Sequence, residues 1–188
     1  MRVIGGKYRS RRLKSLPGLD LRPTSDRLRE TLFNVLTAGN PHALTGAAWL
    51  DLYAGTGAVG IEALSRGAAR VIFVEAEKRG ADLIRENLKA LSIEGDTEVL
   101  CEDTGRALQR LERRGVQYDF CFLDPPYRLR DEYAQTLELL SRSSLLSPQG
   151  LVIAEHEKKF DPGEVRGALR RFRLLVQGDA ALSLYRRA

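Results

Sequence analysis

Residues 50–64 read LDLYAGTGAVGIEAL, and this stretch decides the fold that the sequence predicts. An apolar run that is typical of a buried strand passes into Gly55, Gly57 and Gly60, and a helix pattern follows. In the spacing G-x-G-x-x-G, the first glycines allow a tight turn and the third lets the helix pack closely on the strand. The stretch therefore predicts the first strand, turn and helix of a nucleoside-binding α/β domain.

Further apolar runs after this unit extend the pattern. Strands are expected at 48–53, 70–76, 97–102, 118–124 and 150–157, and four helical patterns separate them. A short helix is expected around Gly163–Arg171, and the run 173–187 reads as a hairpin centred on Gly178 and Asp179. The sequence predicts an α/β fold with a seven-stranded, mostly parallel sheet whose last strand is antiparallel.

The segment that precedes the sheet divides into a basic arm and a helix. Residues 22–39 carry an apolar helical stripe that ends at Gly39. Residues 1–22 contain seven basic side chains and one acidic one, and their Gly-Gly and Pro-Gly pairs indicate a small hairpin or an extended arm. We therefore expect a basic N-terminal arm or hairpin at 1–22 and one main domain at 23–188.

Composition narrows the class of protein. The 188 residues carry a formal charge of +5, which makes a polyanionic partner plausible, and no apolar run is long enough to cross a membrane. The first residues lack a secretory signal, so a cytoplasmic location is expected. Cys101 and Cys121 lie in apolar segments, which predicts reduced core cysteines, and the spacing of metal ligands is absent.

Acidic residues at the strand ends indicate the ligand of the glycine turn. Glu75 follows Gly55 by 20 residues, where a carboxylate can accept hydrogen bonds from ribose hydroxyls. Asp51 lies four residues before Gly55, where it would repel a pyrophosphate and attract a cation. S-adenosylmethionine has a ribose, positive ammonium and sulfonium groups and no phosphate, so it is the predicted cofactor. The predicted cofactor contacts are Asp51, Tyr53, Ala54, Gly55, Gly57, Glu75 and Asp103.

Asp103 is an ambiguous member of that set. It follows the third predicted strand in LCEDTG, where it can accept a hydrogen bond from an adenine amino group. Glu102 is the alternative at one residue's distance. An Asp before Thr104 and Gly105 is equally typical of a helix N-cap.

A second motif, Asp124-Pro125-Pro126-Tyr127, follows the fourth predicted strand. Two prolines make a stiff, non-helical exit from the strand, and in a doubly wound sheet this exit faces the ligand. The Asp124 carboxylate and the Pro125 carbonyl can each accept one hydrogen of an aromatic amine, and Tyr127 can stack on the base. We call residues 124–127 the ledge; the alternative is a simple strand-to-helix turn.

Three blocks of sequence resemble the RsmD family, bacterial methyltransferases of 16S rRNA. The blocks are DPPY at 124–127, DLYAGTGAVGIEALSRGA at 51–68 and RPTSDRLRETLFNVL at 22–36, and the likeness runs from IGGKYRSRRL at 4–13 to the final hairpin. DPPY alone is less specific, since related ledges serve DNA adenine and protein glutamine methyltransferases. The resemblance implies a Rossmann-like class I methyltransferase fold and methyl transfer from S-adenosylmethionine to a guanine N2.

The resemblance also implies a substrate and a set of RNA contacts. The expected partner is 16S rRNA within an assembled or assembling small ribosomal subunit, with neither a membrane nor a metal involved. In the family the front block borders the site, which brings Arg22, Thr24 and Arg29 into the predicted RNA contacts. The basic arm contributes Arg9, Arg11 and Arg12.

Three other functions fit parts of the sequence. A DNA adenine-N6 methyltransferase shares the ledge but usually needs a recognition domain that this length cannot hold. A nicotinamide-dependent oxidoreductase fits G-x-G-x-x-G, but Asp51 and the two prolines oppose it. A noncatalytic RNA-binding module fits the arm and leaves the acids and the ledge unexplained. Without the resemblance, the residues do not distinguish guanine from adenine or identify the nucleotide.

Overall fold

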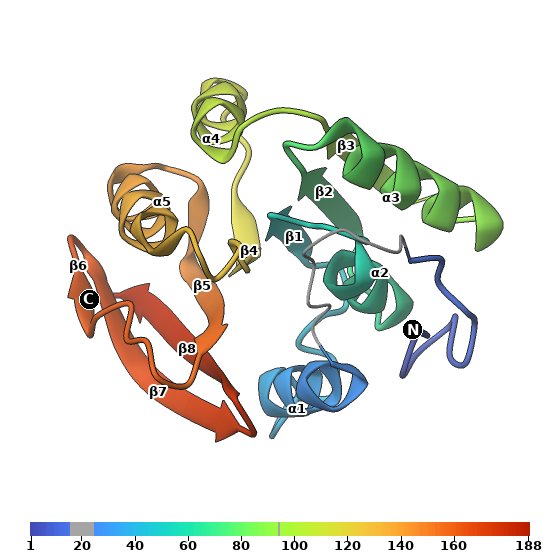
Figure 1. Ribbon diagram of the computed structural model, residues 1–188, viewed down its shortest axis with the longest axis horizontal. Helices are drawn as coiled ribbons and strands as arrows, with labels where there is room; N and C mark the ends of the chain where they lie inside the picture. Colours follow the sequence, from blue (N-terminus) through green and yellow to red (C-terminus); the bar gives the residue numbers. More distant parts are fainter. Residues whose placement is uncertain (16–24, 94) are drawn as a thin grey trace.

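The computed structural model describes residues 1–15, 25–93 and 95–188. One eight-stranded sheet with the order β3-β2-β1-β4-β5-β8-β7-β6 runs through it (Figure 1). The five strands from β3 to β5 are parallel, and β8 is antiparallel to both of its neighbours, β5 and β7. The parallel core and the antiparallel last strand are therefore confirmed.

Strands and helices alternate along the chain after an initial helix. The helices are α1 (Asp26–Leu36), α2 (Ala58–Ser65), α3 (Lys78–Ala90), α4 (Thr104–Arg113) and α5 (Arg130–Arg142). The strands are β1 (Ala48–Leu52), β2 (Arg70–Val74), β3 (Asp96–Leu100), β4 (Tyr118–Leu123), β5 (Leu146–Glu157), β6 (Val165–Arg166), β7 (Leu169–Gln177) and β8 (Ala180–Arg187).

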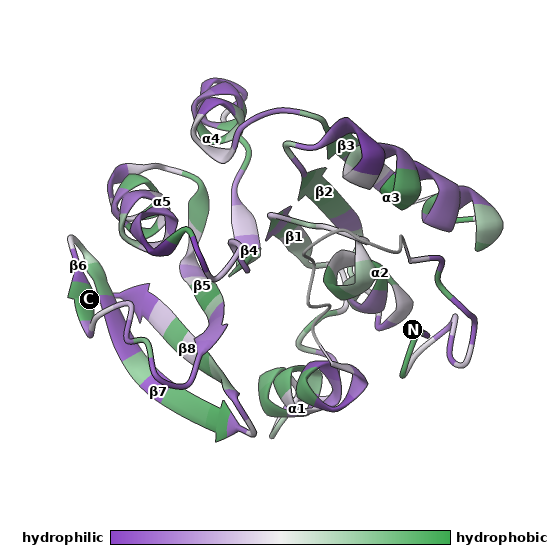
Figure 2. Ribbon diagram, in the orientation of Figure 1, coloured by the Kyte–Doolittle hydropathy of each residue, from purple (hydrophilic) through white to green (hydrophobic). Residues whose placement is uncertain are grey.

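The sheet lies between two layers of helices. On one face, α1, α2 and α3 pack with Trp49, whose ring stacks between Phe33 and Phe120 at centroid distances of 5.5 and 5.3 Å. On the other face, α4 and α5 contribute leucines to a second apolar cluster. Figure 2 shows β1 and β2 as mostly apolar, with polar residues on the outer side of α3. All described helices are too short or too polar to cross a membrane.

The region after β5 differs from the prediction. Residues 163–171 were expected to be helical, but they form β6, a turn and the start of β7, which raises the strand count from seven to eight. Gly163 and Gly167 have φ of +104° and +54°, values that a right-handed helix does not contain. The predicted hairpin at Gly178 is confirmed by antiparallel pairing of β7 with β8.

The described part of the N-terminal arm is a small hairpin fixed to the main domain. Arg2 and Arg12 form an antiparallel bridge. The fully buried Glu62 carboxylate of α2 accepts hydrogen bonds from the backbone N–H groups of Ile4 at 2.7 Å and Gly5 at 2.8 Å. Because a buried carboxylate needs such partners, the hairpin and α2 stabilise each other.

The two cysteines have different environments. Cys121 is buried in β4, as predicted, and burial raises the pKa of its thiol. Cys101 is exposed just after β3, so its assignment to the core was wrong. The last residue of an apolar run at a strand end can lie outside the packed layer.

Candidate active site

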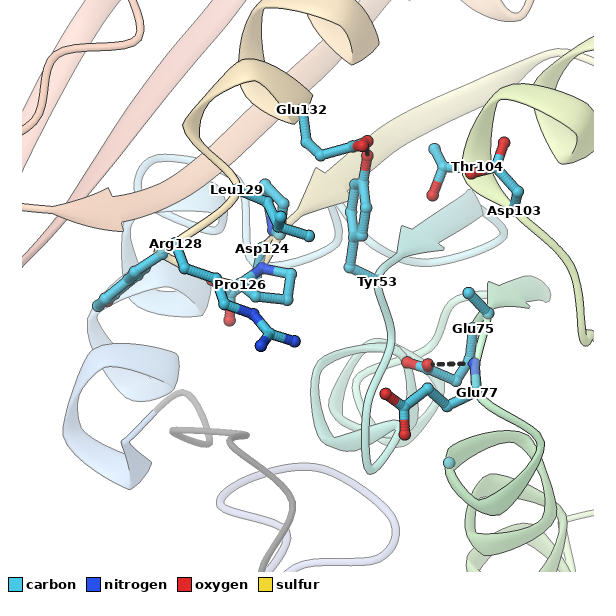
Figure 3. A pocket seen from close by; sticks show the side chains of 14 residues that line it. Tyr53, Glu75, Glu77, Asp103, Thr104, Asp124, Pro126, Arg128, Leu129 and Glu132 are labelled. Carbon is cyan, nitrogen blue, oxygen red and sulfur yellow. Dashed lines mark hydrogen bonds between the residues drawn. The ribbon is translucent and has the colours of Figure 1, made fainter.

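A cavity of about 290 Å³ opens at the carboxyl ends of the parallel strands (Figure 3). It brings the ends of β1, β2, β3 and β4 together with the first turns of α3, α4 and α5, as expected for a doubly wound sheet. Its lining consists of Tyr53, Glu75, Ala76, Glu77, Gly80, Asp103, Thr104, Asp124, Pro125, Pro126, Tyr127, Arg128, Leu129 and Glu132.

Glu75 is held in a fixed orientation at the end of β2. Its Oε2 accepts a hydrogen bond from the Gly55 N–H at 2.8 Å, and its Oε1 accepts one from the Glu77 N–H at 2.9 Å. A Cβ atom at Gly80 would lie 2.8 Å from Glu75 Cγ, so glycine is needed for α3 to approach this closely. Each carboxylate oxygen keeps a second lone pair that can receive a ribose hydroxyl.

The glycine turn supports the site from outside the cavity. Gly55 and Gly57 have φ of +55° and +76°, which explains the preference for glycine at both positions. Neither they nor Ala54 line the cavity in the described part of the chain. The structure shows a scaffolding role for two of them, because Gly55 orients Glu75 and Gly57 begins α2; the contacts of Ala54, Gly55 and Gly57 with the cofactor stay a prediction.

Asp51 does not lie where the sequence suggested. Its side chain is buried behind the turn, and its Oδ2 accepts a hydrogen bond from the Gly60 N–H at 2.9 Å. Burial raises its pKa to about 8, opposed by the Gly60 hydrogen bond and reinforced by Glu75. Spacing in the motif predicts the position of a residue but not the direction of its side chain, so the expected direct contact with a cationic ligand was wrong.

Tyr53 has a strained backbone conformation and forms hydrogen bonds with a helix that is distant in the sequence. Its φ of +58° is unusual for a residue with a side chain, and such strain is concentrated at functional sites. Its hydroxyl is 2.7 Å from Glu132 Oε2 and 2.7 Å from Thr136 Oγ1, both on α5. Burial raises the pKa of Tyr53, so the hydroxyl remains protonated and able to donate. These contacts hold the Tyr53 ring upright at the cavity wall (Figure 3).

Asp103 both caps a helix and lines the cavity. Its Oδ1 accepts hydrogen bonds from the N–H groups of Gly105 at 2.9 Å and Arg106 at 3.3 Å at the start of α4. The two roles considered from sequence are therefore compatible, because one carboxylate can cap the helix and still face the cavity. Its contact with adenine stays a prediction. The alternative acid, Glu102, pairs with Arg110 at 2.9 Å.

The ledge is supported by a buried tyrosine of α5. The Tyr133 hydroxyl lies 2.9 Å from the Glu155 carbonyl oxygen and 3.3 Å from the Pro125 carbonyl oxygen. Beyond the prolines, the Leu129 N–H donates to the Pro126 carbonyl at 2.7 Å and closes a tight turn. The Pro125 carbonyl is thereby held in place next to Asp124, and both residues line the cavity.

Asp124 has unusual electrostatics for a carboxyl at a cavity. Burial, followed by the negative charges of Glu155 and Asp51, raises its pKa well above the ordinary value. A carboxylate destabilised in this way binds a proton or accepts a hydrogen bond more readily than an exposed one. Asp124 is therefore suited to hold an amine hydrogen and to take up a proton.

The predicted RNA contacts divide into three groups. Arg9 and Arg12 are exposed on the hairpin, while Arg11, also exposed, donates to the Ala90 carbonyl oxygen at 3.2 Å. Arg22 and Thr24 lie outside the described residues. Arg29 was predicted wrongly: its side chain is fully buried, and its Nη2 donates to the Arg2 carbonyl at 2.6 Å and to Asp26 at 2.9 Å. Burial also lowers the pKa of Arg29.

Sequence reasoning missed several cavity residues. Glu77 follows Glu75 by two residues, and its place after the second strand was a usable signal. Glu132 reaches the site from α5, 79 residues from Tyr53, and no local pattern indicates that contact. Arg128 directly follows the ledge in the sequence, so its position beside that motif was a usable signal too.

Comparison with known proteins agrees with this arrangement. A family model described as Conserved hypothetical protein 95 matches residues 1–186. The chain is 34% identical over 187 residues to the putative rRNA methyltransferase YlbH of Bacillus subtilis, covering 100% of this chain and 99% of that one. It is 35% identical over 187 residues to Ribosomal RNA small subunit methyltransferase D of Escherichia coli K12, covering 100% and 90%. The solved putative methyltransferase yhhF from Escherichia coli has a TM-score of 0.82 and 32% identity, covering 100% and 97%. The chain therefore belongs to the family of Conserved hypothetical protein 95, which is the RsmD family.

Proposed function

We propose that this protein transfers a methyl group from S-adenosylmethionine to the exocyclic N2 amine of a guanine in 16S rRNA of the small ribosomal subunit. The observation that carries the proposal is the single cavity lined by both Glu75 and the ledge. A ribose-binding acid and an amine-binding acid open into the same space, as group transfer requires. Membership of the RsmD family supports the reaction class.

The residues of the cavity fit the cofactor. Glu75 offers oriented carboxylate oxygens to ribose hydroxyls, and Asp103 can accept from an adenine amino group. The acids that line the cavity are Glu75, Glu77, Asp103, Asp124 and Glu132, against a single cation among the described lining residues, Arg128. This negative charge favours a ligand with cationic groups and disfavours a pyrophosphate. The acids that line the cavity, and not Asp51, therefore argue against binding of a nicotinamide dinucleotide.

The ledge performs the acceptor chemistry. A guanine N2 lone pair is delocalised into the ring, so the amine must be oriented to react. Asp124 and the Pro125 carbonyl each accept one amine hydrogen, and the lone pair is thereby aimed at the methyl carbon. When bound, S-adenosylmethionine would supply a methyl group whose bond to the positively charged sulfur breaks as the bond to N2 forms, which leaves a neutral thioether. After transfer the nitrogen loses a proton, which Asp124 or water accepts; the raised pKa of Asp124 favours this uptake.

The substrate is proposed to be protein-bound RNA. A chain of this size has little surface with which to read a sequence, so shape and phosphate contacts must supply much of the recognition. The hairpin presents Arg9 and Arg12 on a rigid base, because Glu62 anchors its backbone. We propose residues 1–22 as an RNA-binding segment on a methyltransferase domain formed by 23–188, acting in the cytoplasm on an assembled or assembling small subunit.

Mass spectrometry of nucleosides from small-subunit rRNA tests this function. Particles from cells that lack the protein are incubated with S-adenosylmethionine, with and without the purified protein. We expect N2-methylguanosine to appear only with the protein. Methylation at adenine N6, or no methylation of either particles or naked rRNA, would overturn the proposal.

A further inference from the structure

Arg128 differs from the other residues that line the cavity. It is the only cation among the described lining residues, its side chain is exposed, and it makes no hydrogen bond or ion pair with another described residue. By contrast, nearby Arg130 pairs with Glu157 at 3.3 Å, and its guanidinium lies 5.3 Å from the ring centroid of Phe160. Of the two arginines, only Arg128 is available to a ligand in the cavity.

The backbone holds Arg128 in a set relation to the ledge. The hydrogen bond from Leu129 N–H to the Pro126 carbonyl, at 2.7 Å, closes a turn whose two central residues are Tyr127 and Arg128. Pro126 has a restricted φ, and α5 begins directly after the turn. Figure 3 shows the guanidinium next to Pro126, on the cavity side. The backbone of Arg128 is therefore fixed relative to Asp124, and its side chain, which pairs with no other described residue, can turn towards a base held there.

Guanine offers two different edges to these groups. Its N2 amine lies on one edge, and the acceptors O6 and N7 lie on another, where an arginine fork can bind both. Adenine-type purines have an amine at position 6, which cannot accept from a guanidinium. We propose that Arg128 binds O6 and N7 of the guanine whose N2 is held at Asp124, and thereby selects guanine. This inference rests on the proposed function of the site.

The test compares two purines at the methylated position. The nucleotide is first located by mass spectrometry, and 16S rRNA is then assembled by ligation with guanosine or 2,6-diaminopurine there. The second base keeps the 2-amine but carries an amine in place of O6. Arg128→Ala, Arg128→Lys and the control Arg130→Ala are compared with the wild type, with melting temperatures measured to confirm equal folding. S-adenosylmethionine affinity is measured by calorimetry.

Removal of a bidentate hydrogen-bonding group should reduce methylation of the guanosine substrate about 5- to 150-fold in Arg128→Ala. The rate on 2,6-diaminopurine and the cofactor affinity should not change, and Arg128→Lys should fall between, because lysine keeps the charge without the fork. Arg130→Ala should behave as the wild type does.

Three results would overturn this role for Arg128. An equal loss on both purines would indicate a phosphate contact, and a weaker cofactor affinity would indicate a contact with the methionine carboxylate. No loss on either purine in Arg128→Ala would show that Arg128 does not contact the substrate. If the wild type methylates neither purine at N2, the proposed function itself fails, so the two failures are distinguishable.

Discussion

Asp51→Asn should make the protein more stable at neutral and higher pH. The carboxyl is buried, and its pKa is raised from 3.8 to about 8, mainly by burial. The two pKa values differ by about four, and each pKa unit corresponds to about 1.4 kcal/mol. Ionisation of Asp51 therefore destabilises the folded state by about 6 kcal/mol at most. Asparagine removes this charge and keeps an oxygen that can accept from the Gly60 N–H, whose distance to Asp51 is 2.9 Å.

The direction in which stability changes with pH follows from proton binding by Asp51. Because the folded state holds the Asp51 proton more tightly than the unfolded state, the stability due to this group is present below about pH 4 and is lost as pH rises to about 8. Urea unfolding across this range should show the wild type losing up to about 1.4 kcal/mol per pH unit relative to Asp51→Asn.

A control substitution has the opposite sign. Lys78 lowers the pKa of Asp82 from its ordinary value of 3.8 through a hydrogen bond, so the wild type should gain stability relative to Asp82→Asn as pH rises to about 4 and show no further change between about pH 4 and 8. Cofactor affinity should be the same in Asp51→Asn and the wild type, because Asp51 does not line the cavity. Parallel stability curves for Asp51→Asn and the wild type would show that the Asp51 carboxyl has no raised pKa, and a large loss of cofactor affinity would show that Asp51 contributes to cofactor binding.

Three further predictions concern the site and the hairpin. Glu75→Gln should weaken S-adenosylmethionine binding by about 1.5 to 3 kcal/mol, the range for hydrogen bonds to a charged group; calorimetry measures this, and an unchanged affinity would exclude the ribose contact. Tyr127→Phe should keep most activity and Tyr127→Ala should lose about 1 to 3 kcal/mol of base stacking, measured as kcat/KM. If melting temperature falls in step with activity, Tyr127 covers the core edge instead. Replacing Arg9, Arg11 and Arg12 by Ala should weaken RNA binding. It should also reduce the slope of log affinity against log salt concentration by about 0.7 to 0.9 for each phosphate that the variant no longer neutralises. An unchanged salt slope at equal folded fraction would remove the hairpin from RNA recognition.

The fold was largely readable from the sequence because each central strand is a short apolar run between helix patterns. The region 163–171 was not, because its strand conformation depends on the pairing of β7 with β6 and with β8. The positions of Gly163 and Gly167 were the available signal, since both adopt positive φ in turns.

The site was predictable where a strand end sets the position of a side chain. Glu75 and Asp124 both line the cavity for this reason. Arg29 was misjudged although it lies four residues before Phe33 on the buried side of α1, so the helical period indicates its inward direction. The contact between Tyr53 and Glu132 is long-range, and only the packing of α5 against the sheet creates it.

We propose that Asp124 acts on the amine and not on the cofactor. The most direct test is methyl transfer by Asp124→Ala to small-subunit particles at saturating S-adenosylmethionine, with cofactor affinity measured on the same preparation. We predict that transfer to guanine N2 is abolished while the cofactor binds with nearly wild-type affinity, because the amine loses its acceptor and the ribose-binding acid Glu75 remains. Normal transfer by the variant would show that Asp124 is not needed to hold the amine.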